Sequence, residues 1–253
     1  MAAVASSQTA MAAVANNKTA LTAVINNASA LNTVVSSSTA MAAIFRSSTA
    51  LQVVQNNASA WAIFSNASSA VMGKTVAELA GLNPSGYADM NAIASSSTAM
   101  TAVCSSALAF NAALKNSTAR TQLAGSSYLQ SNYDKLLSTV GNSTYFSQKF
   151  DNIDSGAKRA ISGGNTDTTA TANESVFLCK KIGAWSNGNS VTGTVAHLQT
   201  KTTAGSISTR AGGGQSTDDY TTGGVQAKYI CIGGCTFTEN GDAYCCGIFA
   251  FAK

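Results

Sequence analysis

Charge is what this sequence has least of. Only 10% of its 253 residues are Asp, Glu, Lys or Arg, and residues 1–72 contain no acid at all. The only charged side chains in that stretch are Lys18 and Arg46. A nucleic-acid-binding surface needs clustered Lys and Arg to neutralise phosphates, so this composition argues against that class of protein. It also argues against a disordered tail, because disordered chains combine high charge with few apolar residues.

Long apolar runs are missing as well. None approaches the ~20 residues that a helix needs to span a bilayer, and the first residues lack the basic segment and unbroken apolar stretch of a signal peptide. We therefore expect no membrane insertion and find no targeting segment. A soluble chain with so little charge has to bury much of its surface, against copies of itself or in a larger assembly.

What the first half does contain is a ten-residue sequence repeat, here called the phrase, which occurs about seven times before residue 73. A Thr or Ser precedes an Ala, a large apolar residue follows, and a second apolar residue stands three positions later. The first apolar positions are Met11, Leu21, Leu31, Met41, Leu51, Trp61 and Val71, and the second are Val14, Val24, Val34, Ile44, Val54 and Phe64. This spacing favours one face of a helix, and a polar pair such as Asn16–Asn17 separates successive copies.

Ten residues at 100° each would rotate the apolar stripe of a straight helix by about 80° per copy. One relaxed helix is therefore excluded. Two structures remain: a strongly supercoiled multi-stranded helix, or short helices of about six residues that break at each polar pair. We favour breaks, because the Ser or Thr before the apolar segment is a helix-starting residue and Asn tolerates the left-handed conformation that ends a helix. Such helices need neighbouring repeats or neighbouring chains to bury their apolar face.

The phrase pauses after Met72 and later resumes. Residues 73–87 hold a predicted capping box, Thr75 with Glu78, followed by a helix stop around Gly81 and Pro84, and we interpret them as a corner or a lateral contact. The phrase returns one residue out of register and fades by about residue 124. Its resumed apolar pairs are Met90 with Ile93, Met100 with Val103 and Phe110 with Leu114. A more ordinary amphipathic helix is predicted from the spacing of Tyr133, Leu136, Leu137 and Val140.

The last third of the chain has a different residue composition. Gly, Thr and β-formers dominate after a linker-like stretch, and about six strands are expected in the last eighty residues. Asn187-Gly188 and Asn240-Gly241 each stand between two β-rich runs and predict two-residue hairpins. We therefore predict the α+β class: a coiled-coil-like shaft of short helices, then a small antiparallel β-sandwich or barrel knob. The expected boundaries are 1–72 for the repeat shaft or anchor, 73–162 for a second helical region, 163–175 for the linker and 176–253 for the knob.

Four cysteines fall within sixteen residues: Cys231, Cys235, Cys245 and Cys246. A zinc site is one possibility, although the spacing contains no C-x2-C knuckle. A disulfide between Cys235 and Cys246 is another, because a hairpin at Asn240-Gly241 would place these residues opposite each other. Without a secretory signal we favour reduced, buried thiols. Cys104 takes an apolar position of the repeat and is expected to be packed.

The sequence gives little support for hydrolytic catalysis. His197, the only histidine, lies in a predicted strand and is expected to be a packed or surface imidazole. Asp218 and Asp219 are adjacent and would face opposite ways in a strand, which does not favour a paired-carboxylate glycosidase. We therefore expect no enzyme, no catalytic or metal-binding residues and no cofactor. Trp185 and Tyr220, with the 210–224 loop, are candidates for contact with a host surface.

The phrase Ser-Ser-Ser-Thr-Ala-Met-x-Ala-Val/Ile, present at Ser36–Ile44 and Ser95–Val103, resembles repeats in fibre and other virion structural proteins of tailed bacteriophages. The resemblance covers residues 1 to about 123. It implies an elongated homotrimer in the virion, assembled in the bacterial cytoplasm, with an N-terminal attachment region and a C-terminal β-rich knob. Tail, collar or capsid proteins and a host surface glycan or protein are the implied partners. Two alternatives stay open: a bacterial surface adhesin or S-layer-like protein, and a polysaccharide-degrading, tailspike-like enzyme.

Overall fold

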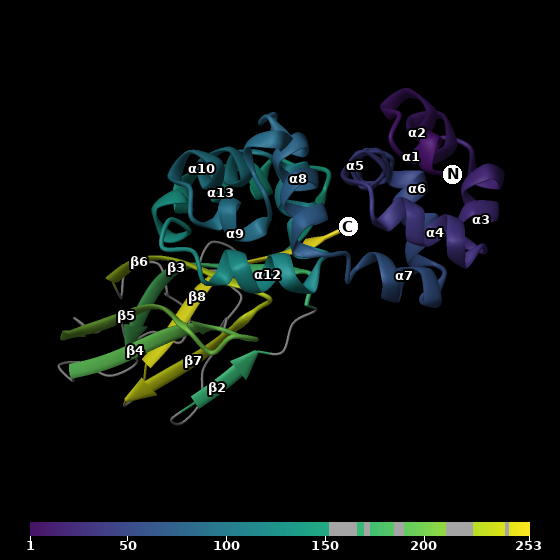
Figure 1. The fold of residues 1–253 in the computed structure, drawn as a ribbon. Helices are drawn as coiled ribbons and strands as arrows, with labels where there is room; N and C mark the ends of the chain where they lie inside the picture. Colours follow the sequence, from purple (N-terminus) through teal and green to yellow (C-terminus); the bar gives the residue numbers. More distant parts are fainter. Residues whose placement is uncertain (152–165, 170–172, 185–189, 211–224, 241–242) are drawn as a thin grey trace. The chain divides into compact units, whose positions relative to one another are not determined.

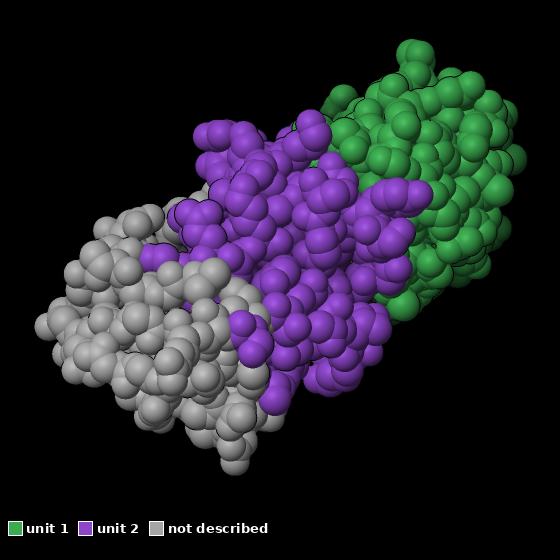
Figure 2. Space-filling view, turned by 90° about the vertical axis from the view of Figure 1, so that its left-hand side faces the viewer, with its two compact units in different colours: residues 1–122 green, residues 123–253 purple. Residues whose placement is uncertain are grey.

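The computed structural model describes residues 1–151, 166–169, 173–184, 190–210, 225–240 and 243–253 (Figure 1). The chain divides into two compact units, residues 1–122 and residues 123–253, which Figure 2 colours separately. The first unit is helical, and the described part of the second combines a helix with antiparallel sheets. The predicted α+β class is confirmed.

Residues 1–64, all of them described, form seven short helices, most of them eight residues long. They are α1 (Ala2–Ala5), α2 (Gln8–Ala15), α3 (Lys18–Ile25), α4 (Ala28–Val35), α5 (Ser38–Arg46), α6 (Ser48–Gln55) and α7 (Ala58–Phe64). Every break falls at a polar pair, as predicted, and the helices are longer than the expected six residues. Each is too short to be stable alone in water, so packing must supply its stability.

The residue that starts each helix differs from the prediction. In α2 the Ser7 side chain accepts a hydrogen bond from the Ala10 N–H, so the cap lies two residues before Thr9, the residue type expected to start the helix. The cap is the second residue of the polar pair because its side-chain oxygen reaches the third helical N–H. Asn therefore starts helices here: Asn17 caps α3, whereas Asn16 ends α2 with an ordinary right-handed φ of −85°.

Consecutive helices turn sharply, and α4 meets α5 at 93°. Three such turns bring the chain back over itself, so α4 stacks on α1, α5 on α2, α6 on α3, α7 on α4 and α8 on α5. One coil therefore contains three helices and about thirty residues; the first coil is residues 1–27 and the second is residues 28–57. The large apolar residues fill the interior, and Met11, Leu21 and Met41 are fully buried. The apolar face closes against neighbouring repeats of the same chain, and residues 1–122 contain no coiled-coil shaft.

The pause in the repeat is a corner. Helix α8 (Ser69–Leu79) starts at the cap Ser68, so Thr75 lies inside the helix, where its Oγ1 is 2.8 Å from the carbonyl oxygen of Val71. The predicted capping box is wrong, because the serine seven residues earlier already starts the helix. The predicted stop is correct: Gly81 has φ +75°, and the Leu82 N–H donates to the Ala77 carbonyl, which closes the helix end.

Beyond the corner the chain runs back. The elements are η1 (Pro84–Gly86), α9 (Met90–Ala94), α10 (Ser97–Ser105), α11 (Ala107–Leu114) and α12 (Ser117–Ala124). The Ser106 hydroxyl, at the start of α11, donates to the carbonyl of Leu79 at the end of α8. The amide of Asn116, past the end of α11, donates to Ala67, before the start of α8. Helix α11 is therefore antiparallel to α8, which reverses the parallel stacking of the first coils.

No single helix among the described residues is long and apolar enough to cross a membrane. In the same described part of the chain, two sharply bent pairs, α4 with α5 and α10 with α11, reach that length and composition when joined.

The second unit contains η2 (Gln130–Asn132), α13 (Tyr133–Gly141) and two four-stranded antiparallel sheets in its described part. The first sheet has the order β1 (Phe146–Asp151), β8 (Ala243–Ala252), β3 (Ser175–Ala184), β6 (Val225–Ile232). The second has the order β2 (Thr166–Thr169), β7 (Cys235–Asn240), β4 (Ser190–His197), β5 (Thr203–Arg210). The described strands form two separate sheets and no closed barrel.

The two sheets share one core. Phe177 and Phe249 of the first sheet have ring centroids 4.5 Å apart, and they pack with Val195 and Phe237 of the second. Helix α13 packs on β1 and β6 and buries Tyr133, Leu136 and Val140, as its spacing predicted. Helix, first sheet and second sheet thus bury each other's apolar surface.

Four expectations about this unit are wrong. Both predicted hairpins fail, because β3 and β4 lie in different sheets and so do β7 and β8. An Asn-Gly pair specifies a turn and does not choose the strand's partner. The residues Val176–Cys179 are all buried, so β3 has both faces covered and takes a central place between β8 and β6. In addition, β1 lies in the region predicted as helical and β2 in the stretch predicted as a linker.

Candidate interaction surface

Hydrogen bonds at the corners join one coil to the next. The hydroxyl of Ser37 donates to the carbonyl of Ala5 at 2.6 Å, and the hydroxyl of Ser47 lies 3.4 Å from the carbonyl of Ala15. Each hydroxyl oxygen also accepts an N–H of the helix that it caps. One side chain thus starts a helix and ties that helix to the coil before it.

Within this structure the first coil contacts a neighbouring coil on one side only, and its burial differs accordingly. Ala10, Val14, Ala20 and Val24 are only half-buried, whereas the residues thirty positions later are fully buried. Those later equivalents are Ala40, Ile44, Ala50 and Val54. The first coil has a neighbouring coil on one side and the second has one on each, so these positions mark the side of the first coil that no other coil in this structure covers. We call the surface formed by Ala10, Val14, Ala20 and Val24 the N-terminal face.

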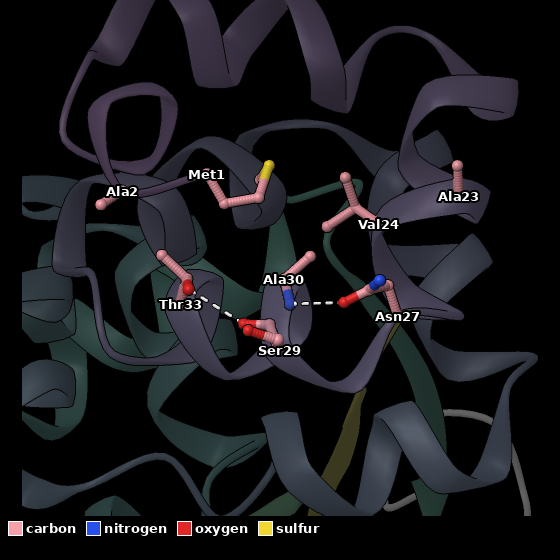
Figure 3. A pocket seen from close by; sticks show the side chains of 8 residues that line it. All are labelled: Met1, Ala2, Ala23, Val24, Asn27, Ser29, Ala30 and Thr33. Carbon is pink, nitrogen blue, oxygen red and sulfur yellow. Dashed lines mark hydrogen bonds between the residues drawn. The ribbon is translucent and has the colours of Figure 1, made fainter.

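A shallow pocket of about 530 Å³ continues this face (Figure 3). It lies between the short helix α1 and the corner that joins α3 to α4, and Met1, Val24 and Ala30 contribute apolar atoms. Two of its polar groups already serve helix α4: Asn27 Oδ1 accepts the Ala30 N–H at 2.9 Å, and Thr33 Oγ1 donates to the Ser29 carbonyl at 2.9 Å. The pocket is therefore a half-apolar recess with few polar groups to orient a small molecule.

The corners of the first coil carry hydrogen-bond donors that point to no acceptor in residues 1–122, all of which are described. These donors are the Ser7 hydroxyl and the side-chain amides of Asn17 and Asn27, whose oxygens cap α2, α3 and α4. Their equivalents in the second coil are the groups that bond to the first coil. Apart from the N-terminal amine, Lys18 supplies the only charge in the first coil. The N-terminal face is thus apolar, nearly neutral and equipped with donors at its corners.

A second recess, about 310 Å³, runs over the stacked corners of three coils and is rich in hydroxyls. It is lined by Ser6, Ser36, Ser37, Ser38, Thr39, Ala70, Val71 and Lys74. The Ser37 hydroxyl is committed to Ala5, so this recess is a by-product of corner stacking.

The cysteines of the second unit lie in the core between the sheets. Cys231, Cys235 and Cys245 are buried and form no disulfide, as expected, and Cys179, which sequence reasoning missed, packs with them. Burial, and then hydrogen bonds to neighbouring thiols, raises the pKa of Cys231 and of Cys245 well above the ordinary value. Both stay protonated at neutral pH, which makes them poor nucleophiles. No three His, Cys, Asp or Glu residues in the described parts of the chain are arranged to hold a metal ion.

The hypothesis of a 235–246 disulfide is wrong in this structure. Cys235 forms no disulfide and lies in β7, where its backbone pairs with His197 of β4, and Cys246 lies in β8, where its backbone pairs with Lys181 of β3. The two residues are in different sheets because the hairpin that would have joined them does not form. Cys104 is free and fully buried, as its repeat position predicted.

His197 is a packed imidazole, one of the two roles expected for it. It is 2% exposed, and its Nδ1 accepts the N–H of Ile232 at 2.9 Å, which joins β4 of one sheet to β6 of the other. Burial lowers its pKa to about 4, so the ring is neutral at pH 7 and available as an acceptor. This arrangement supports the core and leaves no free base.

The remaining candidates for function, Trp185, Tyr220, Asp218 and Asp219, lie outside the described residues. Comparison with protein-family models and with curated proteins finds no match to this sequence. The candidate interaction surface in the described part of the chain is the N-terminal face of the coils.

Proposed function

We propose that the chain is a non-enzymatic structural protein of a tailed-bacteriophage virion: a trimeric fibre of the tail, collar or head. In this role the coil unit attaches the chain to the particle, and the two-sheet unit is a knob that contacts the host surface. The virion assignment comes from the resemblance of the decapeptide phrase, and the structure adds a physical use for that phrase.

One observation supports an attachment role most directly. The coils stack through their corners and interior, and the stack ends in an apolar, nearly neutral face at its N-terminal side. A structural subunit needs such a modular, uncharged contact, whereas an enzyme needs convergent polar groups in a pocket. Because each chain buries its own large apolar residues, the contacts between the three copies are proposed to lie outside the coil interior.

Sedimentation equilibrium of the purified chain is expected to give three times the monomer mass of 25.6 kDa. Antibodies against the chain are expected to label the tail, collar or head of phage particles in electron micrographs. A monomer at all concentrations contradicts the fibre. Labelling of the bacterial envelope with no labelling of particles contradicts the virion role and favours the adhesin alternative.

A further inference from the structure

The chain crosses from the first sheet to the second over a corner of two glycines. Strand β6 ends at Ile232 and β7 begins at Cys235, and the two strands belong to different sheets. Gly233 and Gly234 form the corner with φ values of +75° and +94°, a left-handed conformation that glycine adopts without strain. The cysteines that flank this corner, Cys231 and Cys235, are both fully buried in the core between the sheets.

Both sheets hold this corner in place. The Ile232 N–H donates to Nδ1 of His197, in the second sheet, at 2.9 Å. The Gly233 N–H donates to the carbonyl of Ser175, in the first sheet, at 2.7 Å. The backbone between the two flanking cysteines is therefore tied to both layers of the core, and their thiols are kept close to each other.

Four buried thiols share this core: Cys179, Cys231, Cys235 and Cys245. The thiol of Cys231 is hydrogen-bonded to that of Cys235, and the thiol of Cys245 is hydrogen-bonded to those of Cys179 and Cys235. Within the described residues no three of these groups are arranged around a metal site. The chemistry that their proximity supports is therefore the joining of two thiols as a disulfide.

The strands decide which of the three contacting pairs suits a disulfide. Cys179 and Cys245 are offset by two positions in the ladder between β3 and β8, which places them about 7–8 Å apart, beyond the Cα separation that a disulfide spans. Cys235 and Cys245 come from facing sheets, whose backbones lie about 10 Å apart. Cys231 and Cys235 flank the corner at which one backbone passes between the sheets, so this pair fits best.

We propose that Cys231 and Cys235 form a disulfide when the second unit folds in an oxidising medium, and that this bond fixes the corner between the two sheets. The oxidant is a small disulfide such as oxidised glutathione. The thiolate of one cysteine attacks a sulfur of the reagent and releases one thiol, and the thiolate of the other cysteine then displaces the second. Two protein thiols become one disulfide, and the reagent is reduced to two thiols that take up both protons.

This reaction belongs to the open chain. In the closed core both thiols are fully buried and do not meet a dissolved reagent. Burial also raises the pKa of Cys231 well above its ordinary value, so little thiolate is present there. Because oxidising compartments favour disulfides and the cytoplasm keeps thiols reduced, the state of this pair records the medium in which the unit folded.

Refolding of the full chain tests the pairing. The reduced, unfolded protein is refolded in a mixture of reduced and oxidised glutathione, and the remaining thiols are blocked with iodoacetamide. Trypsin and a glutamate-specific protease release the peptide Tyr229–Glu239, whose two cysteines are Cys231 and Cys235. This peptide is expected to be two hydrogen atoms lighter than its reduced form. A link from this peptide to the one that contains Cys245, or a peptide with both thiols blocked, overturns the proposal.

Variants and a folded sample complete the test. Cys235→Ala should abolish the bond and Cys245→Ala should retain it, and the peptide masses of the unsubstituted chain decide the pairing even where a variant fails to fold. Folded, reduced protein in the same mixture is expected to form the bond at least about 100-fold more slowly than the refolding chain. Equal rates would overturn the claim that the pair records the folding medium.

The effect on the corner has its own readout. The melting temperature of the second unit is expected to be higher in the oxidised protein than in the reduced protein, and an unchanged value would overturn the claim that the bond fixes the corner. Cys104, buried in the helical unit, should be recovered as a free thiol in both samples. The pairing does not rest on the virion role, which fails on the three-copy mass and the labelling of particles.

Discussion

The hydroxyl of Ser37 donates to the carbonyl oxygen of Ala5, thirty-two residues earlier, at 2.6 Å. The hydroxyl oxygen of Ser37 also accepts the N–H of Ala40 and so caps the start of helix α5. Local helix capping and coil-to-coil stacking therefore depend on one atom. This double role helps to stabilise a helix too short to be stable alone, because the bond that caps α5 also joins it to the neighbouring coil.

Replacing this hydroxyl is expected to weaken the stack. Ser37→Ala should lower the free energy of unfolding of the coil unit by about 1–2 kcal/mol, because it removes both a cap and a bond to another coil. Ser37→Thr should restore most of the loss. Urea unfolding followed by far-UV circular dichroism measures both. Ser36→Ala, a change of the exposed neighbour, serves as the control and should stay within about 0.5 kcal/mol; equal effects at both positions would contradict the double role.

Gly73 of α8 lies against the backbone of Asp89, the residue that caps α9. A Cβ at this position would lie 2.2 Å from the carbonyl carbon of Asp89, a backbone atom that cannot rotate away. Gly73→Ala is therefore expected to cost about 3 kcal/mol or more and to shift the melting temperature of the coil unit downward. Gly86→Ala is the matched control, since a Cβ there meets nothing within 4 Å. A neutral Gly73→Ala would show that the two helices can separate without loss.

Acid is expected to destabilise the sheet unit through His197. Its pKa is about 4 when folded against an ordinary value of 6.5, so the unfolded chain binds the proton more readily. The stability contributed by the neutral ring is complete above pH 6.5 and falls as the pH drops toward 4, by up to about 3 kcal/mol. His197→Asn removes this titration. The slope of stability against pH between 6.5 and 4 should therefore be smaller in the variant, and identical slopes would refute the assignment.

Gln130 closes the outer edge of strand β6. Its side chain accepts the Ile230 N–H at 2.7 Å and donates to the Ile230 carbonyl at 2.9 Å, in the manner of a neighbouring strand. Gln130→Ala should therefore speed hydrogen exchange at the Ile230 amide by roughly 10-fold or more. Gln130→Glu retains the acceptor and should speed exchange less. Gln52→Ala, on the exposed side of α6, is the control; unchanged exchange in Gln130→Ala would mean that the edge is protected by other contacts.

Much of the local structure can be read from the residues in order. The breaks at polar pairs, the buried Met and Val positions and the helix stop at Gly81 all depend on neighbours within a few residues. The exact cap was misplaced by two residues because Ser, Thr and Asn are all competent caps, and only the distance to the third N–H selects among them.

The partners of these local elements could not be read in this way. That α5 stacks on α2, thirty residues earlier, depends on the angle of each corner, and the ten-residue phrase looks the same with or without a coil above it. Likewise, β7 and β8 lie in different sheets because β8 pairs along its edges with β1 and β3, and β7 with β2 and β4, a choice of partner that an Asn-Gly turn does not control. The ten-residue spacing thus sets where helices begin and end, while burial of surfaces far apart in the chain sets which faces are covered and leaves the N-terminal face open.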